Sequence, residues 1–105
     1  MSHTKVDTAD VEPIADAMRF LRGPLDCENL GLTLVEAPAD WTGKEHDHAE
    51  DGEEEVYLLT EGEATITVDG ETVALSPGEA LRVSPEATRQ LHTEVESTFV
   101  VAGAP

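Results

Sequence analysis

Two histidines separated by a single residue are the first candidates for chemistry in this chain. His46 and His48 flank Asp47 in a short polar segment that precedes a β-rich stretch. In an extended chain, residues i and i+2 point to the same side, so the two imidazoles converge as two ligands of one ion must. Neutral imidazole binds Zn, Fe, Mn, Ni or Cu. The pair alone is a weak signal, because a metal centre also needs further ligands.

A carboxylate downstream of the pair supplies the third candidate ligand. Glu55 opens a predicted strand over residues 55–60, on which Glu55, Tyr57 and Leu59 share one face. If that face is the interior of a barrel, Glu55 is a buried acid. A buried charge requires a partner or a metal ion, because removing it from water is expensive.

The elements that must position these groups are short strands. Alternation of apolar and polar residues, interrupted by Gly and Pro, predicts strands at 15–22, 30–37, 55–60, 64–68, 71–75, 80–83, 88–93 and 98–101. Asp69-Gly70 is a strong hairpin signal, and Pro77-Gly78 predicts a tight turn. Residues 23–29 read as a loop. The pattern predicts an all-β antiparallel barrel or sandwich over 15–102, with an N-terminal arm over 1–14 and a C-terminal tail over 103–105.

The residues just described resemble a small single-domain cupin of the conserved-barrel type. The first cupin motif runs His-x-His, a short gap, Glu, six residues and Gly, which here is His46, His48, Glu55 and Gly62. The second motif follows the same frame over residues 75–88, and the resemblance covers about 30–101. It implies a double-stranded β-helix, or jelly-roll, barrel with a divalent metal site.

Three departures from the cupin pattern bear on that site. Six residues separate His48 from Glu55, where the motif has three or four, so Glu53 and Glu54 are alternative ligands. The early Gly of the motif is not at its usual offset. The histidine of the second motif is replaced by Arg89, which stays protonated and has no lone pair for a metal. His92 lies three residues further on, and it needs a bulge or a shifted register to reach the ion.

The resemblance therefore implies a metal held by His46, His48 and Glu55, with His92 or water completing the shell. The set suits Fe, Mn, Ni or Zn and leaves positions open for a substrate. Arg89 and Tyr57 are expected to line the cavity and to bind a small, anionic molecule, although Arg89 is equally readable as a rim arginine paired with carboxylates. Whether the protein is an enzyme stays open. The alternative is a cupin without metal that binds or senses a small molecule in its barrel.

The composition excludes several partners. The 105 residues carry a formal net charge of −17, which repels nucleic acid and anionic membranes. No apolar run approaches the length of a membrane span or a signal sequence. The single cysteine, Cys27, fits a reducing cytoplasm. Many acids with few lysines resemble the proteins of salt-accumulating halophiles, archaeal members of the family included; an acidic mesophilic protein is the alternative.

The first predicted strand also bears on assembly. Small cupins are commonly dimers that share N-terminal strands, and residues 15–22 are apolar enough to add to a sheet edge. We therefore expect a homodimer.

Overall fold

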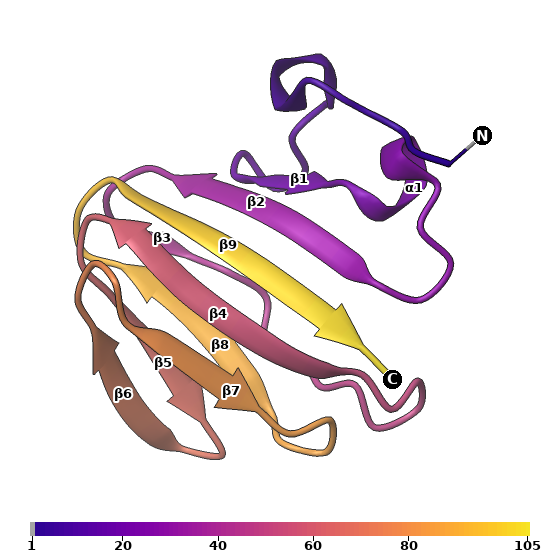
Figure 1. The fold of residues 1–105 in the computed structure, drawn as a ribbon. Helices are drawn as coiled ribbons and strands as arrows, with labels where there is room; N and C mark the ends of the chain where they lie inside the picture. The colour runs from indigo at the N-terminus through magenta and orange to yellow at the C-terminus, as the bar shows by residue number, and fades with distance from the viewer. Residues whose placement is uncertain (1) are drawn as a thin grey trace.

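Two antiparallel sheets contain the nine strands found in the computed structural model, which describes residues 2–105 (Figure 1). The five-stranded sheet has the order β1 (Met18–Phe20), β2 (Gly31–Ala37), β9 (Ser97–Ala104), β4 (Glu54–Glu61) and β7 (Ala80–Val83). The four-stranded sheet has the order β3 (Trp41–Thr42), β8 (Arg89–Thr93), β5 (Ala64–Val68) and β6 (Glu71–Leu75). A 3₁₀ turn, η1 (Thr8–Asp10), and one α-helical turn, α1 (Arg22–Leu25), complete the elements. The predicted all-β jelly-roll fold is confirmed.

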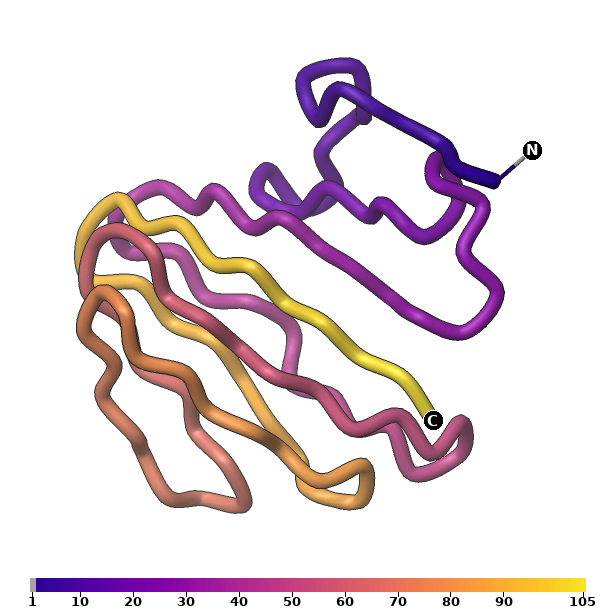
Figure 2. Tube along the Cα trace, in the orientation of Figure 1, coloured from indigo at the N-terminus to yellow at the C-terminus, as the bar shows by residue number. Residues whose placement is uncertain are grey.

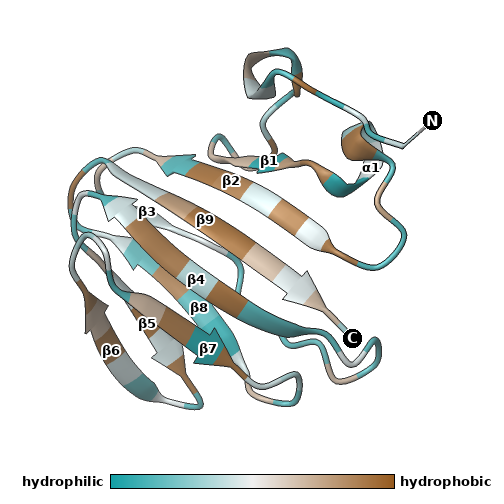
Figure 3. Cartoon of the chain, in the orientation of Figure 1, coloured by the Kyte–Doolittle hydropathy of each residue, from teal (hydrophilic) through white to brown (hydrophobic). Residues whose placement is uncertain are grey.

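Alternation of side chains along the strands builds the core between the sheets. In β9 every second residue is buried, from Ser97 through Phe99 and Val101 to Gly103. β4 likewise buries Tyr57 and Leu59. Figure 3 shows pale and hydrophobic bands in alternation along the first half of β2, whereas β4 and β9 carry hydrophobic residues on both faces. Position 55 therefore faces inward, as the sequence predicts.

Turn residues account for how the chain reverses. Asp69 and Gly70 have φ of 48° and 84°, the left-handed values that a two-residue type I′ hairpin requires, and Val68 pairs with Glu71 across it. Gly62 has φ of 91°, and a Cβ built there would lie 2.2 Å from Ser97 Oγ. Only glycine fits this turn between β4 and β5.

The N-terminal region differs most from the expected elements. Ala15 and Asp16 adopt positive φ, so β1 spans only Met18–Phe20 instead of 15–22. The expected loop at 23–29 begins within α1, which Figure 2 shows beside β2 and outside the two layers. β3 was not expected from the sequence, and β9 extends to Ala104, so most of the expected tail belongs to a strand.

None of the helices between residues 2 and 105 has the length and apolar character needed to cross a membrane.

Candidate metal centre

The two histidines lie between β3 and β4, where the chain crosses from one sheet to the other. The backbone of His46 pairs with that of Arg89 in an isolated bridge, with N···O distances of 3.0 and 2.8 Å, which anchors the segment to β8. His46 Nδ1 lies 3.1 Å from the carbonyl oxygen of Lys44, and His48 Nδ1 lies 3.0 Å from Asp51 Oδ2. Because both partners are acceptors, each Nδ1 donates, and each neutral ring keeps its lone pair on Nε2.

Both Nε2 atoms face the same carboxylate oxygen. His48 Nε2 lies 3.4 Å and His46 Nε2 3.9 Å from Glu55 Oε1. The two rings are arranged edge to face, with centroids 5.2 Å apart. Hydrogen bonds on the Nδ1 side orient the rings in the way that outer partners orient metal-bound imidazoles. The hydrogen bond from His48, followed by the backbone N–H of Glu53, also lowers the pKa of Asp51, so this carboxylate stays ionised as the acceptor.

Glu55 is held from the interior by two further groups. The Tyr57 hydroxyl donates to Glu55 Oε1 over 2.6 Å, and Arg89 NH1 lies 3.8 Å from the same oxygen. Burial, and then the negative charge of Glu55 and its hydrogen bond, raise the pKa of Tyr57, so the phenol remains a donor. Tyr57 and Arg89 thus fix the position of the Glu55 carboxylate from the interior side.

The donor set fits a divalent transition ion. Ligand atoms of His46, His48 and Glu55 all lie within 4.8 Å of one another. Atoms that share one ion at about 2.1 Å are about 3.0–3.4 Å apart, so the observed distances need only a small closure. Two imidazole nitrogens and one carboxylate oxygen are ligands that Fe, Mn, Ni and Zn all accept.

The alternative carboxylates occupy different places. Glu54 lies on the outer face of β4 and pairs with Arg82 at 2.9 Å. Glu53 is buried, with 9% of its surface exposed, and its Oε1 lies 3.0 Å from Arg22 NH2. Glu53 forms a second group with His48 and Asp51, whose ligand atoms also lie within 4.8 Å. The structure thus brings Glu55, and neither neighbour, to both histidines.

His92 does not reach the site. β8 buries Arg89, Leu91 and Thr93, so regular alternation turns His92 to the opposite face. Its Nδ1 lies 2.8 Å from the Thr42 hydroxyl on the neighbouring strand β3. The bulge that would bring His92 inward is not present in β8, whose register with β5 is continuous.

Arg89 and Tyr57 lie behind Glu55 and not on the wall of the adjoining pocket. Arg89 is fully buried; its NH2 donates to the Ser84 carbonyl over 2.7 Å. Its Nε and NH1 are buried without a hydrogen-bond partner among the described residues. Both residues contact Glu55, the candidate metal ligand, and their contact with a small molecule stays a prediction.

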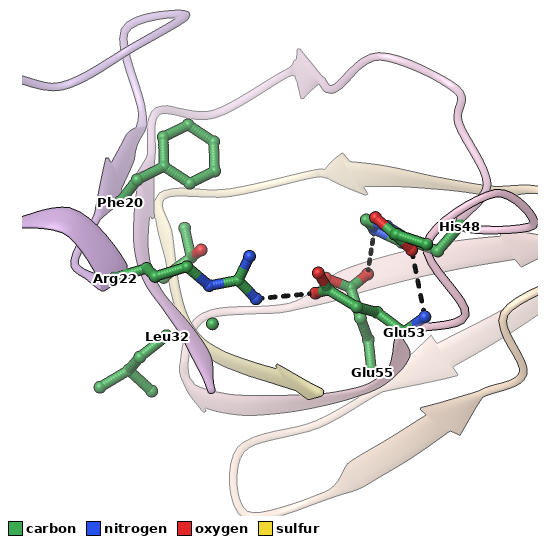
Figure 4. A pocket seen from close by; sticks show the side chains of 9 residues that line it. Phe20, Arg22, Leu32, His48, Glu53 and Glu55 are labelled. Carbon is green, nitrogen blue, oxygen red and sulfur yellow. Dashed lines mark hydrogen bonds and ion pairs between the residues drawn. The ribbon is translucent and has the colours of Figure 1, made fainter. Parts of the chain in front are cut away.

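The pocket itself joins the metal centre to the N-terminal region, in a cavity of about 330 Å³ (Figure 4). One wall carries His48, Asp51, Glu53 and Glu55. The opposite wall carries Phe20, Arg22, Gly31, Leu32 and Thr33. Sequence reasoning missed this second wall, because residues 20–33 lie outside both motifs and only the pairing of β1 and β2 with the barrel brings them here.

Comparisons with known proteins agree with this fold. No curated protein matches the chain. Among solved structures, a cupin protein from Bacteroides fragilis is 25% identical, with a TM-score of 0.76 over 98% of this chain and 82% of that one. KdgF from Halomonas sp. is 15% identical, with a TM-score of 0.77 over 100% of this chain and 94% of that one. A cupin-superfamily sugar phosphate isomerase from Silicibacter pomeroyi is 21% identical, with a TM-score of 0.77 over 96% and 75%.

The family assignment rests on the sequence as well as on the shape. The model of the family described as "Cupin domain" matches residues 33–102, which include both motifs and the whole candidate centre. The chain therefore belongs to the cupin family.

Proposed function

We propose that this cupin binds one divalent transition metal ion through His46, His48 and Glu55, and that the ion receives a small molecule from the adjoining pocket. The observation that carries the proposal is the convergence of both Nε2 atoms on Glu55 Oε1 while both Nδ1 atoms are engaged elsewhere. The ion would supply Lewis acidity at the pocket floor.

The residues of this chain have separable parts in that function. The two imidazoles and Glu55 would bind the ion. Asp51 and the Lys44 carbonyl orient the two rings. Tyr57 and Arg89 contact Glu55 from the interior side and fix its position. The buried Tyr57 ring also limits the access of water to this side of the site.

Calorimetric titration with Fe²⁺, Mn²⁺, Ni²⁺ and Zn²⁺ tests the proposal. The wild type should bind one ion per chain below millimolar concentration, and the His46→Ala/His48→Ala double variant should lose this binding. His92→Ala is the matched control, because it removes an imidazole that points away from the site. Equal binding by the wild type and the double variant would contradict the proposal.

A metal-free binding module is the second candidate, and Arg89 is the observation that favours it. A buried guanidinium 3.8 Å from Glu55 Oε1 places a positive charge beside the carboxylate oxygen that a cation would bind. Two unit charges at about 4 Å interact by about 4 kcal/mol at an effective dielectric constant of about 20. Absence of metal uptake in the titration selects this candidate.

We also propose a salt-adapted, cytoplasmic homodimer as the setting of this function. The charge of −17 and the scarcity of lysine support salt adaptation. The single thiol of Cys27, which forms no disulfide, supports a reducing compartment. The exposed apolar residue Val56 on the five-stranded sheet supports a dimer.

A further inference from the structure

We propose that Arg22 determines the specificity of the pocket by binding a terminal oxyanion, a carboxylate or a phosphate group, of the small molecule that enters the cavity. This inference rests on the proposed metal function and names the chemical class of its ligand. It is carried by the free donors of the Arg22 guanidinium, by the bare strand surface beneath this group and by the charges of the cavity.

The Arg22 guanidinium is held in place by three acceptors and keeps one nitrogen free. Nε donates to the Leu30 carbonyl over 3.4 Å, and NH2 donates to the Asn29 carbonyl over 3.4 Å and to Glu53 Oε1 over 3.0 Å. NH1 has no hydrogen-bond partner between residues 2 and 105, and the side chain is 41% exposed. Figure 4 shows the ion pair with Glu53, while the other terminal nitrogen of Arg22 is free. A guanidinium that is already oriented binds an oxyanion with little further loss of side-chain entropy.

Two glycines form the surface on which this guanidinium lies. Gly31 of β2 pairs with Gly103 of β9, on the inner face of the sheet. A Cβ built at Gly31 would lie 2.6 Å from Arg22 NH2 and 3.2 Å from its Cζ, and a Cβ at Gly103 would lie 3.4 Å from Glu53 Oε1. Glycine within a strand is typical of positions that another group approaches closely. The two glycines therefore allow Arg22 and Glu53 to lie close against the strands.

Within the described part of the chain, no other lysine or arginine lines this cavity. Arg19 and Arg82 form ion pairs elsewhere, with Glu36 and with Glu54. Arg89 is fully buried and does not contribute to the cavity wall. A negatively charged group that enters the cavity therefore meets one guanidinium, on the wall opposite the metal centre.

The formal charges around the cavity favour an anionic ligand once a divalent ion is bound. Asp51 and Glu55 balance the two charges of the ion, and Arg22 balances Glu53. Arg89, which contacts Glu55 from the interior, leaves one positive charge in excess. A ligand with a terminal oxyanion compensates this charge. Because the oxyanion binds Arg22, the neutral end of the ligand faces the ion.

Three small probes that share a 1,2-diol end and differ at the other end test the inference. Glycerol is neutral, 3,4-dihydroxybutanoate carries a carboxylate, and glycerol 3-phosphate carries a phosphate. Each is titrated by calorimetry into Zn²⁺-loaded protein, in a buffer without other oxyanions. We expect at least one of the two anionic probes to bind about tenfold tighter than glycerol, because NH1 of Arg22 donates a charge-assisted hydrogen bond to it. The tighter anionic probe identifies which oxyanion the pocket prefers.

Three variants assign the effect to the Arg22 guanidinium. Arg22→Gln should remove the advantage of the anionic probe over glycerol while the protein still takes up Zn²⁺. Arg82→Gln is the matched control, because it removes a guanidinium that is paired with Glu54 on the outer face, and it should keep the advantage. Gly31→Ala retains the charge of Arg22 but displaces its guanidinium, so it should also weaken binding of the anionic probe. Thermal melts check that all three variants are folded.

Each outcome decides the inference. Equal binding of glycerol and both anionic probes by the Zn²⁺-loaded wild type overturns it. A folded, Zn²⁺-loaded Arg22→Gln variant that keeps the advantage of the anionic probe also overturns it, since the oxyanion then binds the ion itself. An equal loss in Arg82→Gln overturns it as well, because the effect then follows from net charge. These three outcomes leave the proposed metal function intact, whereas protein that takes up no Zn²⁺ loses both.

Discussion

Arg89 is the residue that most distinguishes this centre from one with three histidines. It occupies the place of the second-motif histidine, is fully buried, and leaves Nε and NH1 without hydrogen bonds among the described residues. Buried unpaired donors are expensive, and the contacts that offset this cost are the charge interaction with Glu55 and the hydrogen bond from NH2 to the Ser84 carbonyl. Arg89 therefore competes with a metal ion for the same carboxylate.

Replacing Arg89 should strengthen metal binding. Arg89→His removes the positive charge and supplies an imidazole at the motif position, and we expect at least tenfold tighter binding of Ni²⁺ or Zn²⁺ by calorimetry. Arg89→Met removes the charge without adding a ligand and should give a smaller gain. Thermal melts of both variants check that the barrel is intact. Weaker binding by folded Arg89→His would show that Arg89 supports the centre.

At the level of elements, the turn between β4 and β5 fixes where the carboxylate-bearing strand ends. Gly62 has φ of 91°, and its virtual Cβ lies 2.4 Å from the Glu96 carbonyl and 2.2 Å from Ser97 Oγ. The Ser97 hydroxyl in turn accepts the Glu63 N–H over 3.2 Å. Gly62, the glycine of the first motif, therefore allows the end of β4 to pack closely against the connection between β8 and β9.

A methyl group at this turn should destabilise the fold. We expect Gly62→Ala to lower the free energy of unfolding by about 2–4 kcal/mol, because it adds both strain and a clash with backbone. Gly70→Ala is the control: φ there is 84°, but nothing lies within 4 Å of its virtual Cβ, so we expect a loss of about 1 kcal/mol. Urea unfolding measures both. Equal losses would show that the clash is relieved by movement of the β8–β9 turn.

The outer face of the five-stranded sheet is the surface that bears on assembly of the whole molecule. Val56 is 40% exposed on this face, and Leu58, Leu34 and Val100 are partly exposed on it through the pairing of β4, β9 and β2. β1, which the sequence suggested as a strand shared between subunits, pairs here with β2 of its own chain. We therefore expect the two subunits of the dimer to meet through this outer face, and not through exchange of strands.

Light scattering at high salt should return twice the chain mass of 11.3 kDa. Val56→Lys should shift the protein toward the monomer, because it places a charge within the apolar face while reducing the overall negative charge. Val95→Lys is the control, at a position 44% exposed in the β8–β9 loop. A wild-type mass of 11.3 kDa would refute the dimer.

Net charge should make the stability of the whole chain depend on salt. The charge of −17 opposes compaction, and the Debye length falls from about 10 Å at 0.1 M to about 3 Å at 1 M salt. We expect the midpoint of thermal unfolding, followed by circular dichroism, to rise between about 0.1 M and 2 M KCl. Sucrose at matched osmolality is the control for the stabilisation that results when a solute is excluded from the protein surface. An unchanged midpoint would favour the mesophilic alternative.

Local patterns in the sequence were sufficient to locate the strands of the barrel and the residue types of the candidate metal centre. The apolar period of two located β4 to β9 within a few residues, because alternation and turn chemistry are local properties of the chain. Asp69-Gly70 placed the hairpin for the same reason, since both residues tolerate positive φ. His46, His48 and Glu55 were named from their spacing and from the resemblance to the first cupin motif, which left Glu53 and Glu54 as alternative ligands.

The surroundings of these candidate ligands depend on how the whole chain folds. The pairing of β2 with β9 brings Phe20, Arg22 and Leu32 opposite Glu53, and no local pattern encodes a contact across so many residues. The register of β8 with β5 turns His92 outward and sets Arg89 behind Glu55. Sheet register is fixed by the packing of the whole core, so the pocket and the burial of Arg89 follow from contacts that the linear sequence does not display.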